Sequence, residues 1–115
     1  MNSIKIFHNP KCSKSRQTLE LLKLQGVEPV VIEYLKKPLS KAELLQVLDI
    51  FEGDPMELVR TKEDLFVELN SKIETKEQIA NILADYPQLM ERPLVIKNKK
   101  AVLGRPPEKI LSLFN

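Results

Sequence analysis

The residues best suited to chemistry stand together near the start of the chain, in residues 8–16 with the sequence HNPKCSKSR. This segment holds the only cysteine and the only histidine of the 115 residues. Positive charge gathers around the thiol, because no acidic residue precedes Glu20. Nearby cations and a helix N-terminus both favour the thiolate, which is the nucleophilic form. The segment therefore predicts a reactive Cys12. The alternative is a buried, inert cysteine, but its polar and charged neighbours are not typical of a core segment.

His8 lies four residues before Cys12. It could raise the thiolate population or share a proton with the thiol, and it could equally be a hydrogen-bonded histidine that only shapes the loop. The residues alone leave both roles open. One histidine and one cysteine cannot supply the four protein ligands of structural zinc, so we expect no metal site.

Arginine is used sparingly, with four arginines against fourteen lysines. Arg16 follows the cysteine at Cys-x3-Arg spacing, which does not match the Cys-x5-Arg loop of protein tyrosine phosphatases. The other three are Arg60, Arg92 and Arg105. A planar guanidinium pairs bidentately with a tetrahedral oxyanion, whereas lysine acts as a point charge. Each arginine alone could be a solvated surface charge. Together they are candidates for an anion site.

The elements that would position these residues begin with a strand, a helix and a second strand. Residues 4–7 predict a short strand that ends before Asn9-Pro10. A helix should begin at Cys12 or Ser13 and end at Gly26. Residues 29–34 form a nearly continuous apolar run, which favours a buried parallel strand. This succession is a βαβ unit, whose crossover should be right-handed.

The middle of the chain, residues 40–86, is predicted to be mostly helical. Capping-box patterns start at Ser40 and at Thr75, each ahead of an apolar segment. A short helical piece is expected from Asp54 to Arg60, and Thr61 offers a further N-cap pattern.

The last part returns to strands. Residues 93–96 and 101–103 flank the sequence KNKK, which predicts a β-hairpin, and Pro107 suits the first turn of a final helix. The layout is βαβ, a helical insertion, then ββα, in one domain over residues 1–115. This is an α/β, thioredoxin-like arrangement around a mixed four-stranded sheet, with the first strand central. Such folds often carry a cis-proline opposite the reactive cysteine, and Pro93 is the candidate.

Composition is that of a soluble globular protein, with 43% hydrophobic and 30% charged residues. A net charge of +2 gives no ground for nucleic-acid binding, and no apolar run approaches a membrane span. A single cysteine cannot form an internal disulfide, and the first residues lack the apolar stretch of a signal peptide. We therefore expect a cytoplasmic monomer with no nucleic-acid or membrane partner.

The chain resembles the glutaredoxin-coupled, single-cysteine arsenate reductases, and especially their short arsenate-reductase-like relatives. The resemblance covers essentially the full length. Four segments carry it: HNPKCSKSR at 8–16, LVR at 58–60, MERP at 90–93 and GRPPE at 104–108.

The resemblance implies a role for each matching residue. Cys12 corresponds to the nucleophile of the family. The family's oxyanion-binding arginines correspond to Arg60, Arg92 and Arg105. His8 matches a histidine that lowers the cysteine pKa, and Ser15 matches a residue that stabilises the thiolate. Pro93 matches a proline expected to be cis.

The resemblance also implies a reaction and a role in arsenical resistance. Arsenate binds among the arginines and Cys12 attacks it. Glutathione, a co-substrate and not a bound cofactor, then reduces As(V) to As(III), and glutaredoxin resolves the resulting mixed disulfide. The chain has no second cysteine to do so, which agrees with an external thiol.

Two other functions stay open. Thioredoxin-like relatives that regulate RNA polymerase use a Cys-x-x-Cys redox switch, but Ser15 stands where the second cysteine would be. Those regulators do not need the three arginines. A general glutathione-linked thiol oxidoreductase, with the arginines binding glutathione carboxylates, is the other alternative, and the sequence does not decide against it.

Overall fold

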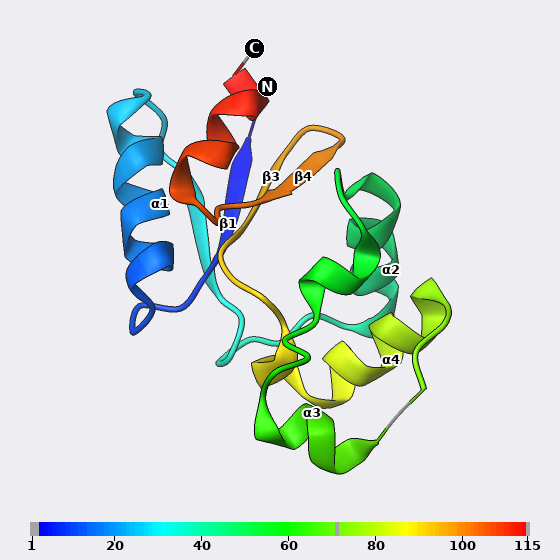
Figure 1. Ribbon diagram of the computed structural model, residues 1–115. Helices are drawn as coiled ribbons and strands as arrows, with labels where there is room; N and C mark the ends of the chain where they lie inside the picture. Colours follow the sequence, from blue (N-terminus) through cyan, green and yellow to red (C-terminus); the bar gives the residue numbers. More distant parts are fainter. Residues whose placement is uncertain (1–2, 71, 115) are drawn as a thin grey trace.

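A four-stranded mixed sheet forms the centre of the computed structural model, which describes residues 3–70 and 72–114 (Figure 1). The strands are β1 (Ile4–His8), β2 (Val30–Glu33), β3 (Leu94–Lys97) and β4 (Lys100–Leu103). Their order in the sheet is β2-β1-β3-β4. β1 runs parallel to β2 and antiparallel to β3, which pairs antiparallel with β4. The α/β, thioredoxin-like arrangement with an interior first strand is thereby confirmed.

Helices cover both faces of the sheet. The helical elements are α1 (Ser13–Leu24), α2 (Lys41–Ile50), η1 (Pro55–Leu58), α3 (Asp64–Leu69), α4 (Lys76–Asp85), η2 (Pro87–Leu89) and η3 (Pro107–Phe114), where η denotes a 3-10 helix. Ile4 and Ile6 pack with residues of α1 and η3, whereas Phe7 packs with α2 and α4 on the opposite face. This alternation follows from the two-residue period of a strand. Among the described residues, none of the helices is both long and apolar enough to cross a membrane.

The capping boxes predicted for α2 and α4 are confirmed. The Glu43 backbone N–H donates to Ser40 Oγ at 3.2 Å, and the Ser40 N–H donates to Glu43 Oε1 at 2.9 Å. Thr75 and Gln78 make the same reciprocal pair at the start of α4. Each box satisfies backbone donors that the first helical turn leaves free.

Two helix boundaries differ from the prediction. Thr61 does not cap α3, which begins after Glu63 without a side-chain cap hydrogen bond. The short helix η1 ends at Leu58 and does not reach Arg60, because Val59 forms an isolated antiparallel bridge with Met90. A long-range backbone pairing has therefore overridden the local helical pattern.

The prediction of a buried second strand is wrong. β2 does pair parallel to β1, but Val30 and Val31 are 51% and 45% exposed. β2 lies at one edge of the sheet and β4 at the other. The final helix η3 packs against α1 and β4, on the β4 side of the sheet. An apolar run does not reveal whether its strand has neighbours on both sides.

The predicted hairpin is confirmed with a shorter connection. β3 extends through Lys97 and β4 begins at Lys100, so only Asn98 and Lys99 form the turn. Asn98 has a φ of 56°, in the left-handed region that asparagine adopts more readily than most residues. The hairpin carries the chain back toward Cys12, where the fourth arginine, Arg105, follows it.

Candidate active site

Cys12 is half-buried at the N-cap of α1. Its backbone N–H donates to the Asn9 carbonyl at 3.0 Å, and the Lys11 N–H donates to Asn9 Oδ1 at 3.0 Å. The Asn9-Pro10 turn thus ends β1 and directs the cysteine to the first turn of the helix. At that place the free N–H groups of the helix face the sulfur.

Hydrogen bonds and charge hold the pKa of the Cys12 thiol below its ordinary value. Burial raises this pKa. The backbone N–H of Ser15, the nearby positively charged guanidinium of Arg92 and the backbone N–H of Lys14 lower it, and together they outweigh burial. The surroundings of Cys12 therefore favour the thiolate, as its nucleophilic role requires.

His8 contacts Ser15. Its Nδ1 lies 3.1 Å from Ser15 Oγ, and the Asn9 N–H donates to that oxygen at 3.0 Å. Burial lowers the pKa of His8; Glu33 raises it and Arg16 lowers it, with a net decrease. A neutral imidazole accepts a hydrogen bond at one of its nitrogens, so it can accept the Ser15 hydroxyl proton. These contacts favour the loop-shaping role for His8, because none of the hydrogen bonds among the described residues joins it to Cys12.

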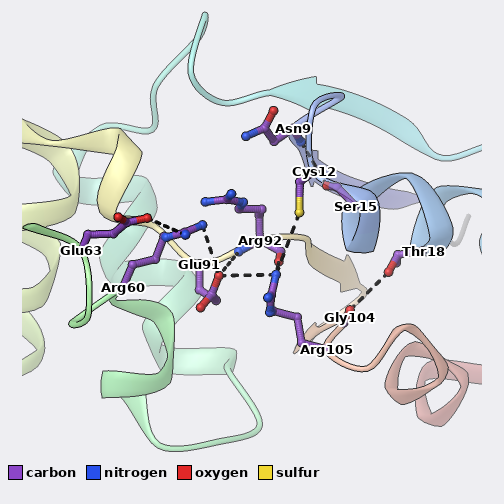
Figure 2. Close-up of polar contacts among 10 residues, drawn as sticks. All are labelled: Asn9, Cys12, Ser15, Thr18, Arg60, Glu63, Glu91, Arg92, Gly104 and Arg105. Carbon is purple, nitrogen blue, oxygen red and sulfur yellow. Dashed lines mark hydrogen bonds and ion pairs between the residues drawn. The ribbon is translucent and has the colours of Figure 1, made fainter.

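Arg105 reaches the cysteine from the segment after β4 (Figure 2). Its NH1 donates to the Arg92 carbonyl at 3.0 Å and lies 3.9 Å from Cys12 Sγ, the outer limit of an N–H···S contact. The Gly104 N–H donates to the Pro93 carbonyl at 2.9 Å, which places the two arginine-bearing segments side by side. The Arg92–Pro93 bond is cis, and so is the Arg105–Pro106 bond, which the sequence did not single out.

Gly104 is required by close packing against α1. Thr18 Oγ1 donates to the Gly104 carbonyl at 3.4 Å. A Cβ at position 104 would lie 2.4 Å from Thr18 Oγ1 and 3.0 Å from Pro93 Cγ, well inside normal contact. The absence of a side chain therefore allows the Arg105 segment to approach the helix that carries Cys12.

Arg60 joins the site through backbone pairing with the segment before β3. The Arg60 N–H donates to the Leu89 carbonyl at 2.8 Å, and the Glu91 N–H donates to the Leu58 carbonyl at 2.8 Å. Arg60 NH2 forms an ion pair with Glu63, and NH1 lies 3.7 Å from Glu91 Oε1. The helical insertion thus delivers a third guanidinium next to the Glu91-Arg92 pair.

Glu91 lies between two of the arginines (Figure 2). Its Oε1 is 3.7 Å from NH1 of Arg60 and 3.7 Å from NH1 of Arg105, and it accepts the backbone N–H of Arg92 at 3.2 Å. Sequence reasoning missed Glu91. Its only local signal is an acidic residue next to an arginine that was itself a candidate.

Two buried polar atoms beside the cysteine have no hydrogen-bond partner among the described residues: Arg92 Nε and the hydroxyl of Tyr34. Burial is the main cause that raises the pKa of Tyr34 to about 12. The charges of Cys12 and Glu91 raise this pKa as well, whereas the charge of Arg92 lowers it. Asn9 influences this pKa weakly, but its geometry falls short of a hydrogen bond. Buried donors normally have acceptors, and an oxyanion oxygen would supply one. Sequence reasoning took Tyr34 as part of an apolar strand and missed this position.

The structure therefore brings together most of the residues that the sequence suggested. Cys12, Arg92 and Arg105 are in contact, and Arg60 connects to them through Glu91. Arg16 points elsewhere and donates to the Pro10 carbonyl at 2.8 Å. Within residues 3–70 and 72–114, no three His, Cys, Asp or Glu side chains are grouped so that they could hold a metal ion.

Comparison with known proteins places this site in a family context. The model of the ArsC family matches residues 7–113. The Escherichia coli protein YfgD is 49% identical over 113 residues, covering 96% of this chain and 95% of that protein. An arsenate reductase of Neisseria meningitidis is 41% identical, with 96% and 97% covered. The solved structure of an arsenate reductase from Vibrio cholerae is 42% identical, has a TM-score of 0.89 and matches 96% of each chain.

Proposed function

We propose that this chain, which belongs to the ArsC family, is an arsenate reductase that uses Cys12 as its nucleophile and glutathione as its reductant. The observation that carries the proposal is the placement of a thiol with a lowered pKa against Arg92 and Arg105, with Arg60 nearby. Relatives of similar length, at 38% and 41% identity, are named arsenate reductase.

Binding of the oxyanion is the first requirement. Arsenate carries one or two negative charges near neutral pH, and guanidiniums meet its oxygens with paired N–H donors. Arg92 has a buried Nε without an acceptor among the described residues, and Arg105 already points an NH1 toward the sulfur. These two groups can hold arsenic within reach of Cys12, and Arg60 adds positive charge at the far side.

Nucleophilic attack forms the covalent adduct. The Cys12 thiolate donates an electron pair to arsenic, a sulfur–arsenic bond forms, and an arsenic–oxygen bond breaks to release hydroxide, which takes a proton from solvent. The arsenic remains As(V). The arginines stabilise the charge that develops on the oxygens during this step, and such stabilisation commonly contributes about a hundredfold or more per donor.

Reduction follows at the adduct. A glutathione thiolate attacks the Cys12 sulfur, a disulfide forms, and the electron pair of the sulfur–arsenic bond passes to arsenic. Two electrons from two thiols thus convert As(V) to As(III), leaving Cys12 joined to glutathione. A glutaredoxin then exchanges this mixed disulfide and frees Cys12, because the chain has no other cysteine to do so.

A coupled assay tests the proposal. Purified protein, glutathione, glutaredoxin, glutathione reductase and NADPH should show arsenate-dependent NADPH oxidation with arsenite as product. Cys12→Ser should abolish it, and Ser13→Ala, at the exposed neighbour on α1, should retain it. Absence of arsenate-dependent turnover in the wild-type protein, with faster reduction of a glutathionylated protein, would instead identify a general thiol oxidoreductase.

A further inference from the structure

We propose that Glu91 is a specificity-determining residue whose carboxylate acts as an internal anion in the arginine site and weakens the static binding of tetrahedral oxyanions. This inference rests on the proposed function, because it concerns the same site. The reaction proposed above gives the Glu91 side chain no role, and this inference supplies one.

A single oxygen of Glu91 faces three donors. Oε1 lies 3.7 Å from NH1 of Arg60 and from NH1 of Arg105, and it accepts the Arg92 backbone N–H at 3.2 Å. Two guanidiniums and one amide are the kind of donor set that holds an oxygen of a phosphate-like anion. The Glu91 carboxylate therefore occupies donors of the arginine site that an oxyanion would otherwise use.

Charge makes the carboxylate and an oxyanion competitors. Arg60, Arg92 and Arg105 contribute three positive charges, and Glu63 and Glu91 offset two of them. Two unit charges about 4 Å apart repel strongly enough to weaken binding by about fivefold in bulk water and by several hundredfold near a protein surface. The Glu91 side chain is 23% exposed and can move away from an arriving anion, which lengthens the separation between the two charges. We therefore expect a value toward the lower end, about tenfold.

The backbone holds Glu91 in place, so only its side chain can withdraw. Its N–H donates to the Leu58 carbonyl at 2.8 Å, beside the bridge between Val59 and Met90. Glu91 also lines a hollow that it shares with Lys109 and with two other acidic residues, Glu52 and Glu57. An arriving oxyanion can displace the Glu91 carboxylate into that hollow, where those two acids oppose it, and the free energy of this displacement weakens the binding of every oxyanion.

As a consequence, the site distinguishes arsenate from phosphate by their reaction with Cys12 and not by their binding affinity. Phosphate and arsenate have the same shape and charge, so the arginines cannot separate them. A weak site releases phosphate quickly, whereas arsenate is retained once Cys12 has bonded to it. Glu91 thereby limits occupation of the site by an oxyanion that cannot react.

The test measures how phosphate and arsenate protect Cys12 from alkylation by iodoacetamide, at fixed pH and ionic strength. Glu91→Gln keeps the size and the acceptor oxygen but removes the charge, and should tighten the apparent binding of both anions by about tenfold. Glu63→Gln removes a charge whose only ion pair within residues 3–70 and 72–114 is with Arg60, and should have a smaller effect. Glu52→Gln, at an exposed neighbour in the same hollow, should have little effect. In the coupled assay, phosphate should inhibit Glu91→Gln more strongly than the wild-type protein.

Equal or weaker binding in Glu91→Gln, with Arg105→Ala losing protection, would overturn this role and leave the proposed function standing. Lack of protection by either oxyanion in every folded variant would overturn both. If Glu91→Gln does not fold, Glu91→Asp provides the test. Its shorter side chain withdraws the charge from the arginines and should tighten binding, whereas unchanged or weaker binding would overturn the role.

Discussion

The guanidinium NH1 of Arg105 lies 3.9 Å from the sulfur of Cys12, although 93 positions separate the two residues in the chain. The contact exists because the β3–β4 hairpin returns the chain to the end of the sheet at which β1 terminates, and because Gly104 allows that segment to pack closely against α1. The contact places a nucleophile next to an anion-binding group, and a site that both binds and attacks an oxyanion needs the two together.

Replacing Arg105 tests that coupling. Arg105→Lys keeps a positive charge but loses the planar fork, and its kcat/KM for arsenate should fall by about a hundredfold, with Arg105→Ala lower still. The measurement is initial rate against arsenate concentration in the coupled assay. Arg16→Lys is the matched control, since Arg16 contacts the Pro10 carbonyl and should lose little. Equal losses in the two lysine variants would contradict the assignment.

The pH dependence of Cys12 alkylation should follow from its lowered pKa. A depressed pKa means that the thiolate already dominates at a pH where a free cysteine is mostly protonated, so half-maximal alkylation should occur below the free value of about 8.5. Arg92→Gln removes a positive charge, so it should shift the profile to higher pH and slow alkylation at neutral pH. Superimposable profiles for the two proteins would argue against a role for Arg92.

Gly104→Ala should destabilise the protein by about 1–3 kcal/mol, because the new methyl group overlaps Thr18 Oγ1. Urea unfolding should show a lower midpoint with an unchanged slope. In a Thr18→Ala background, the same substitution should be less costly, since the overlapping Thr18 atoms are gone and the 3.0 Å approach to Pro93 Cγ remains. An equal loss in both backgrounds would place the strain elsewhere.

The N-cap of α2 provides a prediction about stability alone. Ser40→Ala removes the acceptor for the Glu43 N–H and should lower the free energy of unfolding by about 1 kcal/mol. Thr61→Ala should change it much less, because α3 begins after Glu63 and Thr61 does not cap it. Urea unfolding measures both losses, and equal losses in the two variants would contradict the assignment of Ser40 as the cap of α2.

The sequence predicts those parts of the fold that depend on neighbouring residues. The boxes at Ser40 and Thr75 and the turn before Cys12 use side chains within four positions of each other, and the structure contains all three. The α/β order of elements follows from the same local patterns. Thr61 shows where local patterns fail. Its N-cap pattern predicts a helix start, but the backbone pairing of Val59 with Met90 constrains the same segment, and α3 begins after Glu63.

The rest depends on pairings between distant segments. The contact of Glu91 with Arg60 follows from the bridge between Val59 and Met90, and no spacing rule in the sequence foretells it. The exposure of Val30 likewise depends on the place of β2 at the sheet edge. The rarity of arginine made the three arginines candidates for an anion site, but only the family resemblance assigned them to the same site as Cys12, since each alone is indistinguishable from a surface charge.

The most direct test of the central claim is the mass of the intact protein after incubation with glutathione and arsenate, without glutaredoxin. We predict one glutathione bound through Cys12 for each arsenite released, with no such adduct when arsenate is omitted or when Cys12 is replaced by serine. An adduct that forms equally well without arsenate, or arsenite release without an adduct, would contradict it.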